Sequence, residues 1–326
     1  MLQSNSKTIF ICRKLVQTGF ALYSLYIGIK FYDFFLWATG QSQVYVPRPA
    51  SVEAFLPISA LIGLKHFILT GVYDYVHPAG LTIFISVIII SFLFRRGFCG
   101  WICPVGFLSE LLGIIGSKLK IQFRLVGIVA HLLYSIKYLL LFFFLYMVLW
   151  KMDLQQINAF LQSPYNLVVD GKMLLFFITP SKISIIVLGL LAGLSLLFRN
   201  FWCRFLCPYG ALLGLTALLS PTSIKRDRKR CIGCKSCSKT CPASIDVDTK
   251  ERIRVPECIG CMECIGACGD KKSLTVTIAG FAVNPLIIGI GSVLFFLGAW
   301  LIGYFSGHWN NSVPPFMWKR FYSIFF

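Results

Sequence analysis

A doubled cysteine pattern in residues 231–268 constrains this chain more than any other feature. Two runs share the spacing C-x2-C-x2-C-x3-C, and their eight cysteines are Cys231, Cys234, Cys237, Cys241, Cys258, Cys261, Cys264 and Cys268. In proteins with this spacing, the first three cysteines of a run hold one [4Fe–4S] cluster and the fourth binds the other cluster. The pattern therefore predicts two clusters, and neither half can fold around its metal without the other half.

The same rule gives the expected ligand sets. One cluster takes Cys231, Cys234, Cys237 and Cys268, and the other takes Cys258, Cys261, Cys264 and Cys241. Zinc would be satisfied by two C-x2-C pairs and would not use the third cysteine of each run. A disulfide framework would need an oxidising compartment. The spacing therefore favours two clusters over zinc or disulfides.

Composition places this cysteine-rich segment in a membrane protein. Of the 326 residues, 57% are hydrophobic and only 13% are charged, whereas an ordinary soluble domain carries about 25% charged residues. Five apolar stretches approach the roughly 20 residues that a bilayer requires, namely 15–38, 78–95, 127–150, 181–198 and 283–304. The shorter stretch Ala54–Gly63 contains Pro57 and is expected to form an interfacial or re-entrant helix.

These features predict the fold class and the domains. We expect an α-helical polytopic membrane protein with about five transmembrane helices, an internal repeat, and a small α+β ferredoxin-like domain for two clusters. The expected domains are a membrane domain over residues 1–224, a dicluster domain over 225–275, and a last transmembrane helix with its tail over 276–326.

The distribution of positive charge predicts an orientation. The formal net charge is +18, and lysine and arginine gather in residues 1–14, 95–127 and 199–282. Cations flank the ends of apolar spans at Arg13, Lys14, Arg95, Arg96, Arg199 and Arg204. Such placement is typical of cytoplasmic span ends rather than of a nucleic-acid surface. We therefore expect a multi-pass protein of a bacterial-type inner membrane, in contact with lipid and not with nucleic acid, with a cytoplasmic dicluster domain and an extracytoplasmic C-terminal tail.

A second cysteine motif is repeated within the membrane domain. Residues 93–108 align without gaps on residues 197–212, and 8 of the 16 positions are identical. Each copy contains C-x3-C-P, with the cysteine pairs Cys99 and Cys103, and Cys203 and Cys207. Pro104 and Pro208 fit the first turn of a following helix. The four cysteines are candidates for a further redox or metal site, and two redox-active dithiols or the packing of a tight turn are the alternatives.

The two repeated motifs, CGWICPVG and CRFLCPYG, and the dicluster pattern together resemble the NapH/NosR/MauN group of membrane-bound polyferredoxins over about residues 80–275. The resemblance implies a membrane iron–sulfur protein that passes electrons between the quinone pool and another redox protein of a respiratory chain, as a quinol dehydrogenase component. NapH-like members have four spans, whereas five are counted here. Oxidase-assembly factors that reduce copper share a similar core, and a redox-linked assembly or regulatory role is the alternative.

A quinol site would need a pocket near the membrane interface and a proton acceptor. Candidate acceptors are Glu53, Asp74 and His77 on the expected outer side and Glu110 on the expected inner side. Each of them is more simply an ordinary interfacial or helix-terminal residue. No catalytic residue is therefore assigned from the sequence.

Overall fold

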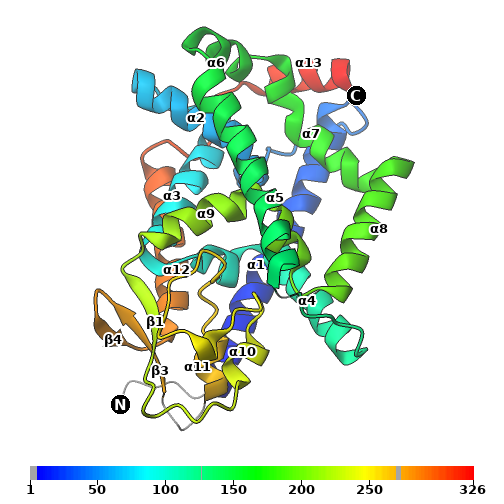
Figure 1. The fold of residues 1–326 in the computed structure, drawn as a ribbon. Coiled ribbons are helices and arrows are strands. Elements are labelled where there is room, and N and C mark those ends of the chain that lie inside the picture. The colour runs from blue at the N-terminus through cyan, green and yellow to red at the C-terminus, as the bar shows by residue number, and fades with distance from the viewer. Residues whose placement is uncertain (1–5, 126, 269–272) are drawn as a thin grey trace. The chain divides into compact units, whose positions relative to one another are not determined.

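The structure, a computed structural model, describes residues 6–125, 127–268 and 273–326. Two compact units divide the chain, and each is assembled from three separate segments. Figure 1 shows the helices and strands along the chain. Unit 1 contains residues 1–21, 87–141 and 189–296, and unit 2 contains 22–86, 142–188 and 297–326. Part of the expected dicluster domain, residues 269–272, lies outside the described residues. The domain boundaries expected at residues 224 and 275 remain predictions.

Helices make up most of the described chain. The α-helices are α1 (Ser6–Ala38), α2 (Pro57–Thr70), α3 (Pro78–Phe94), α4 (Pro104–Lys118), α5 (Gly127–Leu145), α6 (Leu154–Leu161), α7 (Pro164–Ile178), α8 (Lys182–Leu197), α9 (Pro208–Leu218), α10 (Ser236–Thr240), α11 (Glu263–Cys268), α12 (Leu286–Phe305) and α13 (Pro315–Phe325). The strands are β1 (Thr222–Arg226), β2 (Arg252–Ile253), β3 (Leu274–Ile278) and β4 (Phe281–Val283). Short 3₁₀ turns occur at Ala50–Phe55 and Val247–Thr249, and π-helical turns at Phe98–Ile102, Tyr146–Lys151 and Trp202–Leu206.

All five apolar stretches fold as helices, namely α1, α3, α5, α8 and α12. Among the described residues, α12 and the helix from Gly127 to Lys151 are long and apolar enough to cross a membrane. Helices α7 and α8 meet the same criterion only as a pair bent by 74°, which allows up to three spans. Alone, α3 has 17 residues and α8 has 16, fewer than the roughly 20 that a bilayer requires. Two to three candidate spans are thus present, and the number five remains a prediction.

The sequence repeat is also a structural repeat within unit 1. The segments Phe98–Ile102 and Trp202–Leu206 each form a π-helical turn, and α4 and α9 then begin at Pro104 and Pro208. Proline suits this first helical position because its missing N–H would have no partner there and its φ is already helical. The expectation that both prolines start a helix is confirmed.

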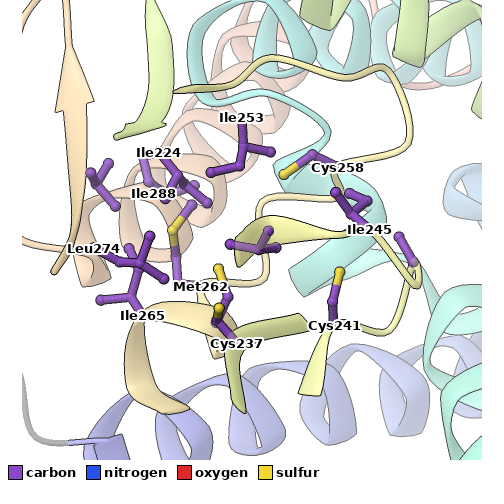
Figure 2. Close-up of a cluster of buried hydrophobic side chains, with 14 of the residues drawn as sticks. Ile224, Cys237, Cys241, Ile245, Ile253, Cys258, Met262, Ile265, Leu274 and Ile288 are labelled. Carbon is purple, nitrogen blue, oxygen red and sulfur yellow. The ribbon is translucent and has the colours of Figure 1, made fainter. Parts of the chain in front are cut away.

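The cysteine-rich segment folds as a small α+β layer in unit 1. Its antiparallel sheet has the strand order β2-β1-β3-β4, with Ile224 paired to Val276 on one side and to Ile253 on the other. The two short helices, α10 and α11, pack against each other. Figure 2 shows Ile224, Ile253 and other apolar side chains in one buried cluster with Cys237, Cys241 and Cys258, and Cys264 belongs to the same cluster. A sheet of only 15 residues cannot bury much apolar surface alone, and thiols therefore make up part of the core.

Unit 2 is held together by a buried network of ionic side chains. Helix α2 packs on α6, and α7 packs on α13. The Arg48 guanidinium donates a hydrogen bond of 2.6 Å to Glu53 and one of 2.7 Å to Asp170. Tyr322 donates to the other oxygen of Asp170 at 2.6 Å. Because a buried charge is tolerated only when it is paired and hydrogen-bonded, this network joins α7 and α13 to the segment that precedes α2.

We predict a pH dependence of unit 2 from His77, which lies 3.4 Å from a Glu53 oxygen. Burial alone would lower the pKa of His77, but the hydrogen bond and the charge of Glu53 outweigh burial and raise it. Because the folded pKa exceeds the unfolded value of about 6.5, protonation of His77 stabilises the fold below that pH, and the contribution is lost as the pH rises through the folded pKa.

Thermal unfolding of the solubilised protein should therefore show a loss of stability above about pH 6.5 that is smaller in His77→Gln. The exposed His131 supplies the control, and His131→Gln should keep the wild-type pH profile. Identical profiles for wild type and His77→Gln would contradict this account of the network.

Candidate functional site

The four cysteines expected at one cluster line a single small cavity in unit 1. Cys241 is the C-cap residue that follows α10, Cys264 lies in α11, and Cys258 and Cys261 lie in the loop before α11. All four are buried and line the cavity together with Ile224, Pro242 and Ile253, among other residues. Burial raises the pKa of the thiols of Cys241, Cys261 and Cys264. These thiols therefore stay protonated until a metal displaces the protons.

The other expected set of four is arranged less compactly. Cys237 is buried in α10 and lies within electrostatic range of Cys268 at the end of α11. Cys231 and Cys234 lie within range of each other in the loop that precedes α10. In the described parts of the chain, no three Cys, His, Asp or Glu side chains converge closely enough to bind a single metal ion. The donors are nevertheless all thiols, which is the ligand chemistry of [4Fe–4S] clusters.

The cysteines of the two repeated motifs gather at a second place in unit 1. Burial raises the pKa of Cys203, and the negative charges of Cys207, Cys103 and Cys99 raise it further. Each π-helical turn ends one residue before the second cysteine of its pair, and that cysteine occupies the N-cap position of the following helix. There the Cys207 sulfur accepts a hydrogen bond of 3.2 Å from the Gly210 amide. The duplicated fold thus brings two distant C-x3-C pairs within electrostatic range of each other.

Two buried cations accompany these four thiols. The Arg96 guanidinium lies 3.8 Å from the Cys99 sulfur and within electrostatic range of Cys203 and Cys207. Lys137, from α5, lies 3.5 Å from a Glu257 oxygen and within electrostatic range of Cys207. Neither Nε of Arg96 nor Nζ of Lys137 has a hydrogen-bond partner among the described residues. A buried N–H donor without a hydrogen-bond partner is costly. This site therefore holds more positive charge than the described side chains around it neutralise.

The first C-x3-C motif is docked directly on the loop that carries Cys258 and Cys261. Trp101 donates from its indole nitrogen to the Gly260 carbonyl at 3.0 Å, and Arg95 donates to the Val255 carbonyl at 2.6 Å. The position of Gly100 cannot hold a side chain, because a Cβ there would lie 2.3 Å from the Ile259 carbonyl oxygen. Arg96 also donates to the Pro256 carbonyl at 3.2 Å. One short segment therefore contacts the backbone of the loop that carries Cys258 and Cys261 and, through Arg96, the Cys99 sulfur.

Arg13 of α1 joins the same parts of unit 1. Its guanidinium donates to the Gly100 carbonyl at 2.8 Å, pairs with Glu110 of α4 at 2.5 Å, and pairs with Glu263 of α11. Lys14 adds a 2.6 Å contact to Glu110. Burial opposes the ionisation of Glu110, but the charge of Arg13 and the hydrogen bond and charge of Lys14 outweigh burial and lower the pKa of Glu110. Glu110 is therefore held as a carboxylate.

The structure separates the proton-acceptor candidates named from the sequence. Glu53 and His77 belong to the buried network of unit 2, and Asp74 accepts hydrogen bonds from the amides of Val76 and His77. Glu110 belongs to unit 1, where it is paired with Arg13. All four candidates thus have structural partners.

Sequence reasoning missed the roles of Arg13, Arg96 and Lys137. It treated the two arginines as flanking charges that orient the spans. Lys137 carried a usable signal, because an ionisable residue inside an apolar stretch is a candidate functional residue.

Comparison of the amino-acid sequence with known proteins identifies matching family models and relatives. Residues 76–122 and 183–227 match a family model described as a 4Fe-4S binding domain, and residues 223–269 match a 4Fe-4S dicluster domain. The chain is 39% identical over 317 residues to the "Putative electron transport protein YccM" of Escherichia coli, covering 94% of this chain and 88% of that protein.

Two further relatives cover less of the chain. Protein NirI of Paracoccus denitrificans is 31% identical over 183 residues, which are 55% of this chain and 26% of NirI. The ferredoxin-type protein NapH of Haemophilus influenzae is 27% identical over 208 residues, which are 60% of this chain and 68% of NapH. No solved structure matches this chain.

We predict that Arg13→Met strongly destabilises unit 1. The substitution leaves Glu110 and Glu263 without their shared cation, and their side chains are only 9% and 15% exposed. Removing one partner of a buried ion pair costs about 3–5 kcal/mol. The control is Arg124→Met, which breaks a pair with Asp246 that is 41% and 56% exposed and should cost less than about 1 kcal/mol. Denaturant unfolding in micelles measures both variants, and equal losses would contradict a central role for Arg13.

Proposed function

This chain belongs to the family of 4Fe-4S membrane proteins that includes YccM, and we propose that it passes electrons between the quinone pool and another redox protein. The observation that carries the proposal is the position of Arg96 in unit 1. It contacts the Cys99 sulfur in one group of thiols and the Pro256 carbonyl, in the loop that carries another. Because Arg96 contacts both the first group of thiols and the loop of the second, the two groups fit a chain of redox centres better than two isolated metal sites.

The two clusters of the dicluster pattern would be held as the spacing predicts. One set is Cys231, Cys234, Cys237 and Cys268, and the other is Cys241, Cys258, Cys261 and Cys264. When bound, such clusters supply one-electron redox centres whose potential depends on charge, hydrogen bonds and solvent exposure. The cavity lined by the second set supports this assignment. Trp101 and Arg95 would keep the loop of that set in place through their hydrogen bonds to its carbonyls.

A further iron–sulfur centre is proposed at the C-x3-C pairs, held by Cys99, Cys103, Cys203 and Cys207. The 4Fe-4S binding family model spans both pairs. The buried charges of Arg96 and Lys137 would offset the negative charge of four thiolates and their metal. This electrostatic fit favours a metal centre over the packing role that the sequence left open.

The proposed placement in the membrane follows the charge pattern. It has five spans, the dicluster domain in the cytoplasm of a bacterial-type inner membrane, and the C-terminal tail on the outer side. The basic segment after β1, with Arg228 and Lys229 exposed, would meet lipid headgroups or an acidic redox partner. Both partners are compatible with the same surface.

We predict about twelve iron atoms per chain after anaerobic purification, four for each of three cubane centres. Replacing Cys99, Cys103, Cys203 and Cys207 together by alanine should remove about four irons and block electron transfer from quinol to the dicluster domain. Cys258→Ala should instead disturb the dicluster signals in electron paramagnetic resonance. Cys12, outside both motifs, supplies the control, and Cys12→Ala should keep all the iron. Full iron and normal transfer in the quadruple variant would leave those four cysteines with a packing role.

We also predict that reporter fusions after Lys272 and at Phe326 lie on opposite sides of the membrane. Between these positions, α12 has 20 residues and is apolar enough to cross a bilayer. The fusion after Lys272 should report the cytoplasm because cations concentrate in residues 199–282. Reporters on the same side would remove α12 from the set of spans.

A further inference from the structure

A cavity of about 460 Å³ lies in unit 1 beside the thiol-lined cavity. Its wall is built from α1, α4 and α11, and the carboxylates of Glu110 and Glu263 belong to it. Pro242 lines both cavities. Pockets that bind small molecules commonly have volumes of roughly 300–1,000 Å³. This cavity is therefore large enough for a single ring compound, and it shares the lining residue Pro242 with the cavity of the four buried thiols.

The two carboxylates of the cavity, Glu110 and Glu263, differ in how many further hydrogen bonds they can accept. Glu110 already accepts four hydrogen bonds, two from Arg13 and one each from Lys14 and Gln17, and a carboxylate has about four acceptor sites. Glu263 pairs with Arg13 through one carboxylate oxygen only. Its other oxygen forms no hydrogen bond with the described residues. Glu263 is thus the carboxylate with capacity for a ligand.

The remaining lining is largely apolar, with Ile9, Phe10 and Ile114 in the wall. Exposed apolar side chains continue along both framing helices, with Leu15 of α1 68% exposed and Ile115 of α4 47% exposed. Such a surface suits contact with lipid.

We propose that this cavity binds the ring of a quinone or quinol, and that a quinol hydroxyl donates a hydrogen bond to the Glu263 carboxylate. The assignment rests on the proposed exchange of electrons with the quinone pool. A lining that is largely apolar by area, with a free acceptor on Glu263, suits an uncharged ring with hydroxyl substituents. An anionic lipid headgroup fits less well, because Glu110 and Glu263 in the wall oppose the cations Lys7 and Arg199.

Filling the cavity tests the proposal. A Cβ added at Gly113 would lie 3.6 Å from Gln122 and 3.9 Å from Arg199. These are ordinary contacts, so the first carbon of a new side chain is accommodated and the rest of a leucine would extend into the cavity. Gly113→Leu is the main variant, and Ile114→Phe is a second one at the same wall. The matched control is Gly193→Leu in α8, because a Cβ there would meet no atom within 4 Å.

The probe is heptyl-hydroxyquinoline N-oxide, a fluorescent quinone analogue, added to the full-length holoprotein in phosphatidylcholine nanodiscs. Wild type and Gly193→Leu should quench its fluorescence with the same affinity, and the two filled variants should bind at least about tenfold more weakly. Iron content and thermal unfolding establish that the variants are folded. Wild-type affinity in both filled variants, or no binding to wild type, overturns the proposal. Loss of wild-type binding when phosphatidylglycerol is included assigns the cavity to an anionic headgroup and also overturns it.

Reduction of the clusters by a short-chain quinol separates this proposal from the proposed function. Quinol-dependent reduction that is unchanged in Gly113→Leu would place quinol oxidation elsewhere and leave the electron-transfer function standing. Reduction that is lost in Gly113→Leu and retained in Gly193→Leu supports both proposals. A wild-type protein that binds the probe but is not reduced by quinol would support the cavity and remove the exchange with the quinone pool.

Discussion

The buried guanidinium of Arg13 is the interaction on which the arrangement of unit 1 depends. It contacts α4 through Glu110, α11 through Glu263, and the first C-x3-C motif through the Gly100 carbonyl. Removing one partner of a buried ion pair leaves the other charge buried and unpaired, which is far more costly than replacing both partners by apolar residues. Both carboxylates and the arginine must therefore stay together. This requirement holds the cysteine-rich layer against α1 and α4, and it shapes one wall of the cavity proposed for the quinone ring.

Buried positive charge also surrounds the thiols. Several cations of unit 1 are buried, namely Arg13, Arg95, Arg96, Lys137 and Arg204. Most of the arginines in this group also hydrogen-bond to backbone carbonyls or to side chains of the cysteine-rich layer. The sequence pattern alone indicates only that the four arginines orient the spans. Their burial gives them a second role, because positive charge near thiolates and an anionic metal centre stabilises the negative charge and tends to raise a reduction potential.

Duplication explains how two short motifs become one site. Each copy forms a π-helical turn followed by a helix that starts at proline, so the second cysteine of each pair caps a helix. Helix N-termini favour negative charge because their amide N–H groups point outward. Glycine permits the close approach that follows: a Cβ at Gly210 would lie 2.7 Å from the Arg96 guanidinium. The repeat therefore supplies four thiols, two favourable helix ends and room for a shared cation.

The sequence by itself determined the chemistry of this protein, and the tertiary structure decided which residues act together. Cysteine spacing is a local property, so both the eight-cysteine pattern and the C-x3-C repeat could be read directly. The prolines at 104 and 208 likewise predicted where two helices begin. Span number was harder to predict, because hydropathy does not reveal that α3 and α8 are short or that α7 and α8 are bent. The partners of Arg13, Arg96 and Lys137 lie about 90 to 160 residues away in several cases, and only folding brings such groups together. A buried ion pair leaves no periodic signal in the chain, since its energy depends on burial and distance rather than on sequence spacing.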